Sequence, residues 1–443
     1  MASISNIIKK QPQLIRRACY SIVPFRYRYG SKFRETCDFL ENADSWSYDK
    51  AKDYQLNKLR KLLIYCSKKI PYYYTLFKEH GFDPNIQCFE ALRNLPTLNK
   101  ETINKNKSLL LTPRNKDKLC KFGTSGSTGE RLEFFGDDDL YKIEAAFVWK
   151  AYHDQGATLY DKPSVWIRRY SPKKGDPISF EDHELKRHYM SAFHLNEETV
   201  LDYVNFINES KVELLVSYPS TIHYLATLCK KSNLVLNHVK YIHGASEVCL
   251  PSWREVIKTE LGAEIKMHYG QIEKVSFAHQ DSEDNDYREN LLYGYNEFLE
   301  DGDIIATGFH NKVMPFIRYE TKDRALLKES PKLDGAFPKT IEDILGRDGD
   351  MLLTIKRSKV PAVNFYSFMG KFREVDAFQI TQKEETLELD FYIIPSERFN
   401  LLTEDKLLQE MYNRLGEIPI KIHQVNELNR DKKSKKLKTI ALI

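Results

Sequence analysis

The chain has 443 residues and a formal net charge of +4, with 42% hydrophobic, 12% aromatic and 29% charged residues. This length suffices for a large domain plus a smaller one, and the apolar fraction excludes a mostly disordered chain. The small net charge does not favour a nucleic-acid partner, and no apolar run approaches the roughly 20 residues that an integral membrane segment needs.

The first 30 residues are basic and partly apolar. Lys9, Lys10, Arg16 and Arg17 interrupt them before a signal-peptide core can form, so we expect the start of the first domain, with docking on an anionic membrane surface as the alternative. The seven cysteines are odd in number and include no C-x-x-C pair. They indicate neither a disulfide framework nor a zinc site, and favour a cytoplasmic protein.

Helical and strand patterns follow one another along the chain. Residues 48–70 carry apolar side chains at helical spacing and end at Pro71. Further on, three strands are expected at 212–217, 239–244 and 263–270, with one helix after Pro219 and another opening at Pro251. This alternation is typical of a parallel α/β sheet.

Each of these three strands ends in a small or polar cluster, namely 218–220 (YPS), 244–247 (GASE) and 269–273 (YGQIE). Ligands of open α/β sheets bind outside the carboxyl ends of the strands. We therefore expect one shared site there, and the alternative is that these clusters are ordinary connecting turns.

The pattern changes near 346–350 (GRDGD). Beyond it, residues 386–394 and 418–425 alternate like half-exposed strands, and between them lies a helix that we expect Thr403 to cap. The fold class predicted is therefore α/β, with a large N-terminal domain at 1–346 and a small α+β domain at 347–443.

The segment 122-FGTSGSTGERLEF-134 is the strongest local signal. It is no Walker loop, because no Lys follows at the required position, and it lacks the G-x-G-x-x-G spacing of dinucleotide sites. The hydroxyl groups of Ser125, Ser127 and Thr128 can still surround an anion, and Gly126 and Gly129 permit close backbone approach. The alternative is a flexible turn.

The order of motifs resembles the adenylate-forming (acyl- and aryl-CoA ligase) superfamily, most closely its phenylacetate-CoA ligase and CapK-like branch. The matching segments are TSGSTG (124–129), GASE (244–247), HYGQIE (268–273), MPFIRYETKD (314–323) and GRDGD (346–350), preceded by IPYY (70–73) and LPTLNKE (95–101). The resemblance covers nearly the whole chain, and implies that the small C-terminal domain is a mobile lid.

The resemblance implies that a carboxylic acid attacks the α-phosphorus of ATP, giving an acyl-adenylate and pyrophosphate. A carboxylate is already ionised at neutral pH, so the site must supply charge neutralisation and positioning rather than a triad. ATP and Mg²⁺ are the implied cofactors, and coenzyme A is the simplest acceptor. The alternatives are an amine acceptor, for example on a surface-polysaccharide sugar, and a degenerate nucleotide-binding protein.

The same resemblance assigns roles to individual residues. The phosphate loop is Ser125, Gly126, Ser127, Thr128 and Gly129. The adenine side is Gly244, Ala245, Ser246, Tyr269 and Gly270; the ribose ligand is Asp323; the metal ligand is Glu273; the acid pocket includes Tyr218 and Ser220. Arg347 contacts ribose and phosphate, and Lys436, with Lys435 next, reaches the α-phosphate.

Each assignment has a plain structural alternative. Tyr269 could plug the end of the sheet, Glu273 could be a solvated loop acid, and Asp323 could form a surface ion pair. Arg347 has the same alternative as Asp323. Lys436 lies in a basic run, which is usually a solvated tail.

Several positions depart from the motifs. Ile272 stands where a Thr or Ser is usual, and Glu320 and Lys322 replace the usual Arg and Gly before Asp323. Gly349 occupies a hinge position that is usually acidic, and residues 354–360 lack the usual Gly. The hinge changes fall where the small domain rotates, so adenylate formation is better supported than the second half-reaction.

Overall fold

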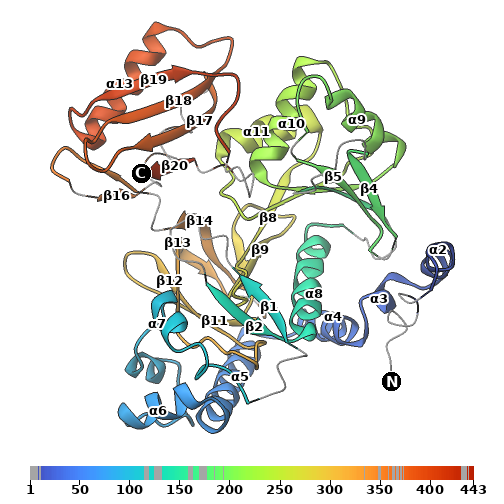
Figure 1. Cartoon of the computed structure of the whole chain (residues 1–443), viewed down its shortest axis with the longest axis vertical. Coiled ribbons are helices and arrows are strands. Elements are labelled where there is room, and N and C mark those ends of the chain that lie inside the picture. The colour runs from blue at the N-terminus through green and yellow to red at the C-terminus, as the bar shows by residue number, and fades with distance from the viewer. Residues whose placement is uncertain are drawn as a thin grey trace.

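The computed structural model describes residues 8, 11–113, 119–123, 132–157, 163–168, 177–183, 185–192, 194–333, 335–347, 351–357, 359–361, 365, 369, 372, 374–430, 437 and 439–443. The chain begins with helices that lie at one end of the molecule and beside α8 (Asp138–Asp154; Figure 1). They are α2 (Gln13–Ile22), α3 (Phe25–Arg28), α4 (Ser31–Ala43), α5 (Tyr48–Lys69), α6 (Pro71–Glu79), η1 (Glu90–Asn94) and α7 (Lys100–Lys105).

Helix α5 confirms the helix predicted at 48–70. The Ser47 side chain accepts a hydrogen bond from the backbone N–H of Lys50, so it caps the first turn, and Leu59, Leu63 and Cys66 are buried. Pro71 then opens α6, where its missing N–H costs nothing.

A mixed sheet of twelve strands forms the centre of the molecule. In sheet order its strands are β11 (Gly294–Phe298), β12 (Asp303–Gly308), β13 (Tyr319–Lys332), β14 (Lys339–Arg347), β10 (Tyr287–Glu289), β9 (Phe277–Gln280), β8 (Ile265–Gly270), β7 (Tyr241–Ala245), β6 (Leu214–Ser217), β3 (Ser164–Arg168), β5 (Arg187–Ser191) and β4 (Ser179–Asp182). A separate hairpin joins β1 (Cys120–Gly123) to β2 (Glu133–Gly136).

The parallel part of this sheet confirms the three predicted strands. β5, β3, β6, β7 and β8 run parallel, and helices cover both faces: α10 (Pro219–Lys231) and α11 (Pro251–Leu261) on one, α8 (Asp138–Asp154) on the other. α9 (Val200–Glu209) joins the first group. Successive residues of β6 alternate between the two cores, with Leu215 packing in the α10 and α11 core and Leu214 and Val216 in the α8 core.

A buried ion pair stabilises the antiparallel part. The Arg318 guanidinium donates to both carboxylate oxygens of Glu297, at 2.9 and 3.0 Å, and also to the carbonyl oxygens of Arg93 and Leu95. Arg318 is 8% exposed and Glu297 4%. The pair therefore ties the N-terminal helical region to the sheet just before β13.

The C-terminal part is a separate four-stranded sheet in the order β19, β18, β17, β20. Its elements are β15 (Met351–Leu353), β16 (Lys359–Pro361), β17 (Val375–Gln382), β18 (Leu389–Pro395), α13 (Leu401–Leu415), β19 (Ile420–Gln424) and β20 (Ile440–Leu442). The strands and helix predicted here are confirmed, but the predicted cap is wrong. The helix begins at Leu401, because the Asn400 side chain accepts the hydrogen bond from the backbone N–H of Thr403.

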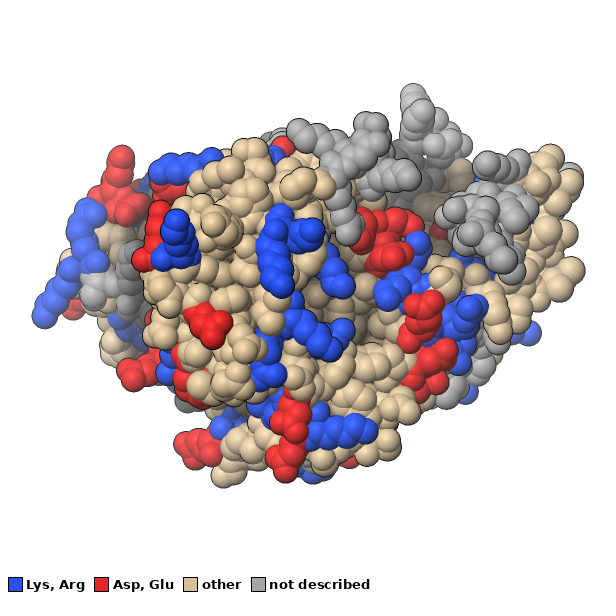
Figure 2. Space-filling model, turned by 90° about the horizontal axis from the view of Figure 1, so that it is seen from below, with Lys and Arg blue, Asp and Glu red and all other residues tan. Residues whose placement is uncertain are grey.

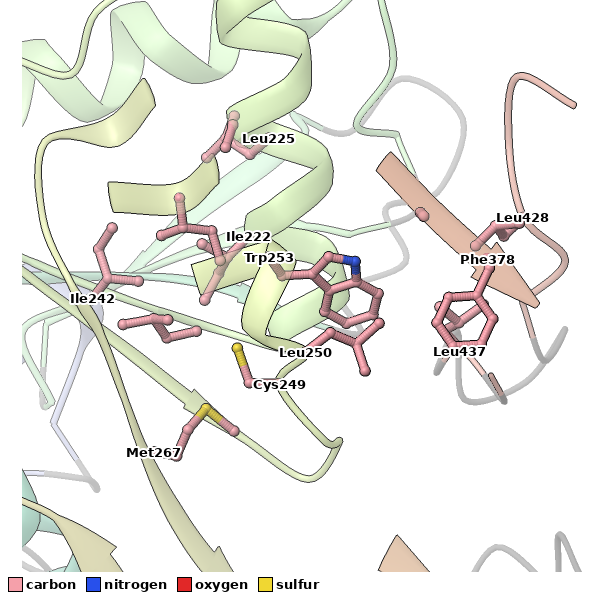
Figure 3. Close-up of a cluster of buried hydrophobic side chains, with 14 of the residues drawn as sticks. Ile222, Leu225, Ile242, Cys249, Leu250, Trp253, Met267, Phe378, Leu428 and Leu437 are labelled. Carbon is pink, nitrogen blue, oxygen red and sulfur yellow. The ribbon is translucent and has the colours of Figure 1, made fainter. Parts of the chain in front are cut away.

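The two parts share an apolar contact. Trp253 and Leu250 of the N-terminal part face Phe378, Leu428 and Leu437 of the C-terminal part (Figure 3). Beside this contact, a cavity of about 270 Å³ lies between the start of α10 and residues 427–430.

Basic and acidic side chains are interspersed on the face that Figure 2 shows, as the small net charge suggests. Within the described ranges, no helix is long and apolar enough to cross a membrane.

Replacing Arg318 with Met should lower the free energy of unfolding by about 3–5 kcal/mol, because Glu297 would stay buried without its cation. The double variant R318M/E297M removes both charges and should recover most of that loss. Urea-induced unfolding measures both. A single variant that costs no more than a surface change, about 0.5 kcal/mol, would contradict this role of the pair.

Candidate active site

Four neighbouring strands present one row of residues at their carboxyl ends. Ala245 of β7 pairs with His268 of β8. Trp166, Val216 and His243 pair across β3, β6 and β7. The residues two positions further along these strands are Arg168, Tyr218 and Ala245, respectively. Because side chains of a strand alternate between faces, Arg168, Tyr218, Ala245 and His268 share one face of the sheet. The predicted clusters after β6, β7 and β8 therefore do converge.

Tyr269 joins β8 to the antiparallel part of the sheet. Its hydroxyl group donates to Oδ2 of Asp323 at 2.9 Å, and the Gln271 side-chain amide donates to the same oxygen at 3.2 Å. Asp323 is 6% exposed, so it is no surface ion-pair residue. Burial and then the Asp323 carboxylate raise the pKa of Tyr269, which stays protonated and able to donate.

Three non-glycine residues next to assigned site residues have left-handed backbones, one of them Lys274, which follows Glu273 and has φ +59°. Ser246, at the end of β7, has φ +73°, and Lys322, just before Asp323, has φ +61°. Lys322 stands where the motif usually has Gly. Its left-handed backbone explains why Gly is usual there, because only Gly adopts this conformation without steric cost. Strain of this kind is common at functional sites.

Gly244 is fixed by packing. A Cβ atom there would lie 2.5 Å from Sδ of Met267 and 3.2 Å from Cγ of Pro219, so a larger residue would force both side chains to shift. Gly270 lies at the exposed end of β8.

Glu273 is buried at 3% exposure, which excludes the solvated loop acid. The Tyr319 hydroxyl donates to its Oε1 at 2.8 Å. Its other oxygen, Oε2, is buried and has no hydrogen-bond partner among the described residues. An unsatisfied carboxylate oxygen fits a hard cation such as Mg²⁺. Across the described ranges, no cluster of three or more His, Cys, Asp or Glu could hold a metal by itself.

A chain of hydrogen bonds runs through the sheet below His268. The Gln155 amide nitrogen donates to the Ile242 carbonyl at 2.8 Å, so its Oε1 faces Nδ1 of His243 at 2.9 Å as an acceptor. Nε2 of His243 then lies 2.8 Å from Nδ1 of His268. Burial and then the charge of Arg168 lower the pKa of His268 to about 3, so both rings are neutral at pH 7.

The Glu247 carboxylate connects the site to the C-terminal part. Its Oε2 accepts from the backbone N–H of Ser220, and its Oε1 from the backbone N–H of Leu437, both at 3.2 Å. The Arg430 guanidinium donates to the Ser220 hydroxyl at 2.8 Å. Ser220, assigned above to the acid pocket, thus contacts Glu247 and the C-terminal part in this arrangement.

Several assigned residues lie outside the described residues. They are Ser125, Gly126, Ser127, Thr128, Gly129, Gly349, Lys435 and Lys436, and of Arg347 only the backbone is described, paired with Asp323. Ile272 is 40% exposed.

Sequence reasoning missed Arg168, Gln271 and the His243–His268 pair as site residues. Arg168 ends β3 and stacks on Tyr218, with its guanidinium carbon 4.6 Å from the ring centroid. The two histidines lie in the strands predicted at 239–244 and 263–270, where a polar residue in a buried strand was the available signal; the strand that ends at Arg168 was not predicted.

The architecture is that of the adenylate-forming ligases. Over 88% of this chain and 89% of the other, it resembles 2-hydroxyisobutyryl-CoA ligase, solved in the postadenylation state with an acyl-AMP, with TM-score 0.68 and 17% identity. An anthranilate CoA ligase with anthranoyl-AMP matches at TM-score 0.50 and 13% identity, over 79% of this chain and 74% of that one.

In sequence, the chain is similar to protein CapK of Staphylococcus aureus, with 24% identity over 375 residues, 82% of each chain. No family model matches. The expected likeness to this superfamily and to its CapK-like branch is confirmed, as is the fold class.

The lowered pKa of His268 predicts a dependence of stability on pH. Below about pH 6.5 the unfolded chain binds a proton on this imidazole that the folded chain refuses, so stability is fully present above that pH and is lost on acidification toward about 3. Replacing His268 with Gln should flatten the slope of unfolding free energy between pH 6 and 4 by up to about 1.4 kcal/mol per pH unit.

Urea-induced unfolding at several pH values measures this slope. His423 is partly exposed and pairs with Asp390 in the C-terminal part, and His423→Gln serves as the control. Parallel slopes for His268→Gln and the parent would contradict the assignment.

Proposed function

We propose that this chain is an ATP-dependent, AMP-forming carboxylate ligase, which activates a carboxylic acid as an acyl-adenylate and transfers it to an acceptor. One observation carries the proposal. The residues assigned to adenosine and to metal lie at one sheet edge, and the backbone N–H of Leu437 donates to Glu247 of the GASE segment at that edge. The fold is the one on which acyl-adenylates are bound in the solved ligases.

The adenosine would lie against β7 and β8. Ala245 and Ser246 would line one side of the base and the Tyr269 ring the other, while its hydroxyl holds Asp323 in place for the ribose. A carboxylate accepts strong hydrogen bonds from two neighbouring hydroxyl groups.

The phosphates would lie between the loop at 124–129, which directly follows β1, and Glu273. Oε2 of Glu273 would complete the coordination of Mg²⁺ together with phosphate oxygens. The metal would neutralise phosphate charge. Backbone amides and hydroxyl groups of the loop would hold the departing pyrophosphate.

We further propose a division into domains 1–346 and 347–443. The last strand of the large sheet in chain order, β14, ends at Arg347. The next strand, β15, begins at Met351 and bonds to the C-terminal sheet: the Gln382 side chain accepts from the backbone N–H of Leu353 and donates to its carbonyl oxygen. The C-terminal domain would carry Lys436 to the reacting phosphate, where its charge stabilises the transition state.

Coenzyme A is the proposed acceptor, because the solved relatives are named as CoA ligases. The similarity to CapK keeps an amine as the second candidate. Hydroxylamine trapping would report the adenylate in either case, whereas consumption of free thiol would occur only with coenzyme A.

Pyrophosphate release across aryl, fatty, hydroxy and amino acids tests the activity. Lys436→Ala should reduce adenylate formation by about 10²–10³-fold, the typical effect of losing one transition-state contact. Lys421→Ala, an exposed change in the same domain, is the control and should match the parent. Adenylate formation at the parental rate in Lys436→Ala would refute the assignment of this lysine.

Asp323→Asn should raise KM for ATP by about 10–100-fold, because hydrogen bonds to a charged group are worth roughly 1.5–3 kcal/mol. KM for the acid should change much less. Steady-state kinetics with each substrate varied in turn measures both values, and an unchanged KM for ATP would show that Asp323 does not bind ribose.

A further inference from the structure

Arg168 is a cation that has no counter-ion among the described residues. Its guanidinium carbon lies 4.6 Å from the Tyr218 ring centroid and 5.7 Å from that of Trp166, and no acidic side chain in the described part of the chain forms an ion pair with it. The side chain is half-buried at the carboxyl end of β3. Half-buried arginines usually pair with an anion, so this one is open to an anion from outside the protein.

The layer directly below this row supplies a second donor. Tyr152 of α8 packs against His243 and Trp166, at 4.7 and 6.5 Å between ring centroids, and these two residues precede Ala245 and Arg168 by two positions. The Tyr152 hydroxyl is buried and has no hydrogen-bond partner within the described ranges. The Tyr152 side chain is 1% exposed, so an unmet hydroxyl there is costly without a ligand.

The other end of the row is neutral. Gln155 must accept from Nδ1–H of His243, so Nε2 of His243 is a lone pair that accepts from Nδ1–H of His268. Nε2 of His268 is therefore unprotonated and is a hydrogen-bond acceptor without charge. Because His268 is neutral, the positive charge in the row of Arg168, Tyr218, Ala245 and His268 is that of Arg168.

The row has a direction with respect to the nucleotide. His268 directly precedes Tyr269, which contacts Asp323, while Arg168 lies three strands away on β3. The guanidinium reaches back over Tyr218 of the β6 end, which places it about two strand spacings, or roughly 10 Å, from β8. An acid whose reacting carboxylate lies beside the nucleotide would thus extend its far end toward Arg168.

Resting on the proposed function, we propose that the acid substrate carries a second anionic group at its far end, a distal carboxylate, which Arg168 binds with support from the Tyr152 hydroxyl. Such a site selects dicarboxylic acids. It disfavours monocarboxylic acids of the same length, because these leave the Arg168 and Tyr152 donors unpaired.

Pairs of acids that differ only in the distal carboxylate test this proposal, for example adipate with hexanoate and isophthalate with benzoate. Pyrophosphate release should give the parent at least about 100-fold higher kcat/KM for one of the diacids than for its monoacid partner. Arg168→Gln should remove most of this preference by lowering kcat/KM for the diacid about 10–150-fold. The monoacid value should change little.

Two further variants test whether the planar guanidinium of Arg168 is required and whether any arginine change has the same effect. Arg168→Lys keeps the charge without the planar fork and should retain part of the preference. Arg398→Gln, an exposed arginine of the C-terminal part, should behave like the parent.

Calorimetric titration with the same diacids separates this inference from the proposed function. If no acid releases pyrophosphate but a diacid binds the parent and not Arg168→Gln, the proposed function fails and the anion site stands. If monoacids are activated as well as diacids, or Arg168→Gln affects both alike, the inference is overturned and the ligase stands. If no acid releases pyrophosphate and no diacid binds, both the proposed function and the anion site are overturned.

Discussion

The register of four parallel strands is the constraint on which the site depends. β3, β6, β7 and β8 pair so that Arg168, Tyr218, Ala245 and His268 fall in one row. A slip of one residue would exchange the two faces of a strand. In β7 it would move His243 into the α10 and α11 core and Ile242 toward α8, which would bury an imidazole without its glutamine. The packing of both cores therefore keeps the polar row at the open edge.

The segment at 314–323 shows how support and function share one motif. Arg318 and Tyr73 hold its first half, the former by an ion pair with Glu297 and the latter by hydrogen bonds to Pro315 and Ile317. Two residues of its second half reach the proposed site: Tyr319 donates to Glu273, and Asp323 accepts from Tyr269. The positive φ values of Arg318 and Lys322 are maintained because the surrounding contacts over-determine the backbone.

The sequence was sufficient where the signal is local. Pro219 and Pro251 open helices, Gly262 ends one with φ +73°, and short apolar runs form the buried strands between them. The cap at Thr403 was misplaced because Asn400, three residues earlier, is an equally good cap and only the structure shows which one bonds.

Long-range order was out of reach of such signals. Arg168 and His268 are one hundred residues apart, and nothing local says that their strands end in one row. Glu273 likewise depends on the distant Tyr319, whose hydroxyl group donates to its Oε1. The phosphate loop at 124–129 and Lys436 lie outside the described residues and stay predictions.

The double acceptance by Glu247 has a thermodynamic consequence. The Glu247 carboxylate accepts a hydrogen bond from the first turn of α10 and another from the backbone at Leu437, so both interactions depend on the same side chain. Any molecule that competes for this carboxylate weakens the association of the two halves of the protein. By reciprocity, that association weakens the binding of the molecule by the same factor. The affinity of such a molecule would therefore measure how strongly the N-terminal and C-terminal parts associate through Glu247.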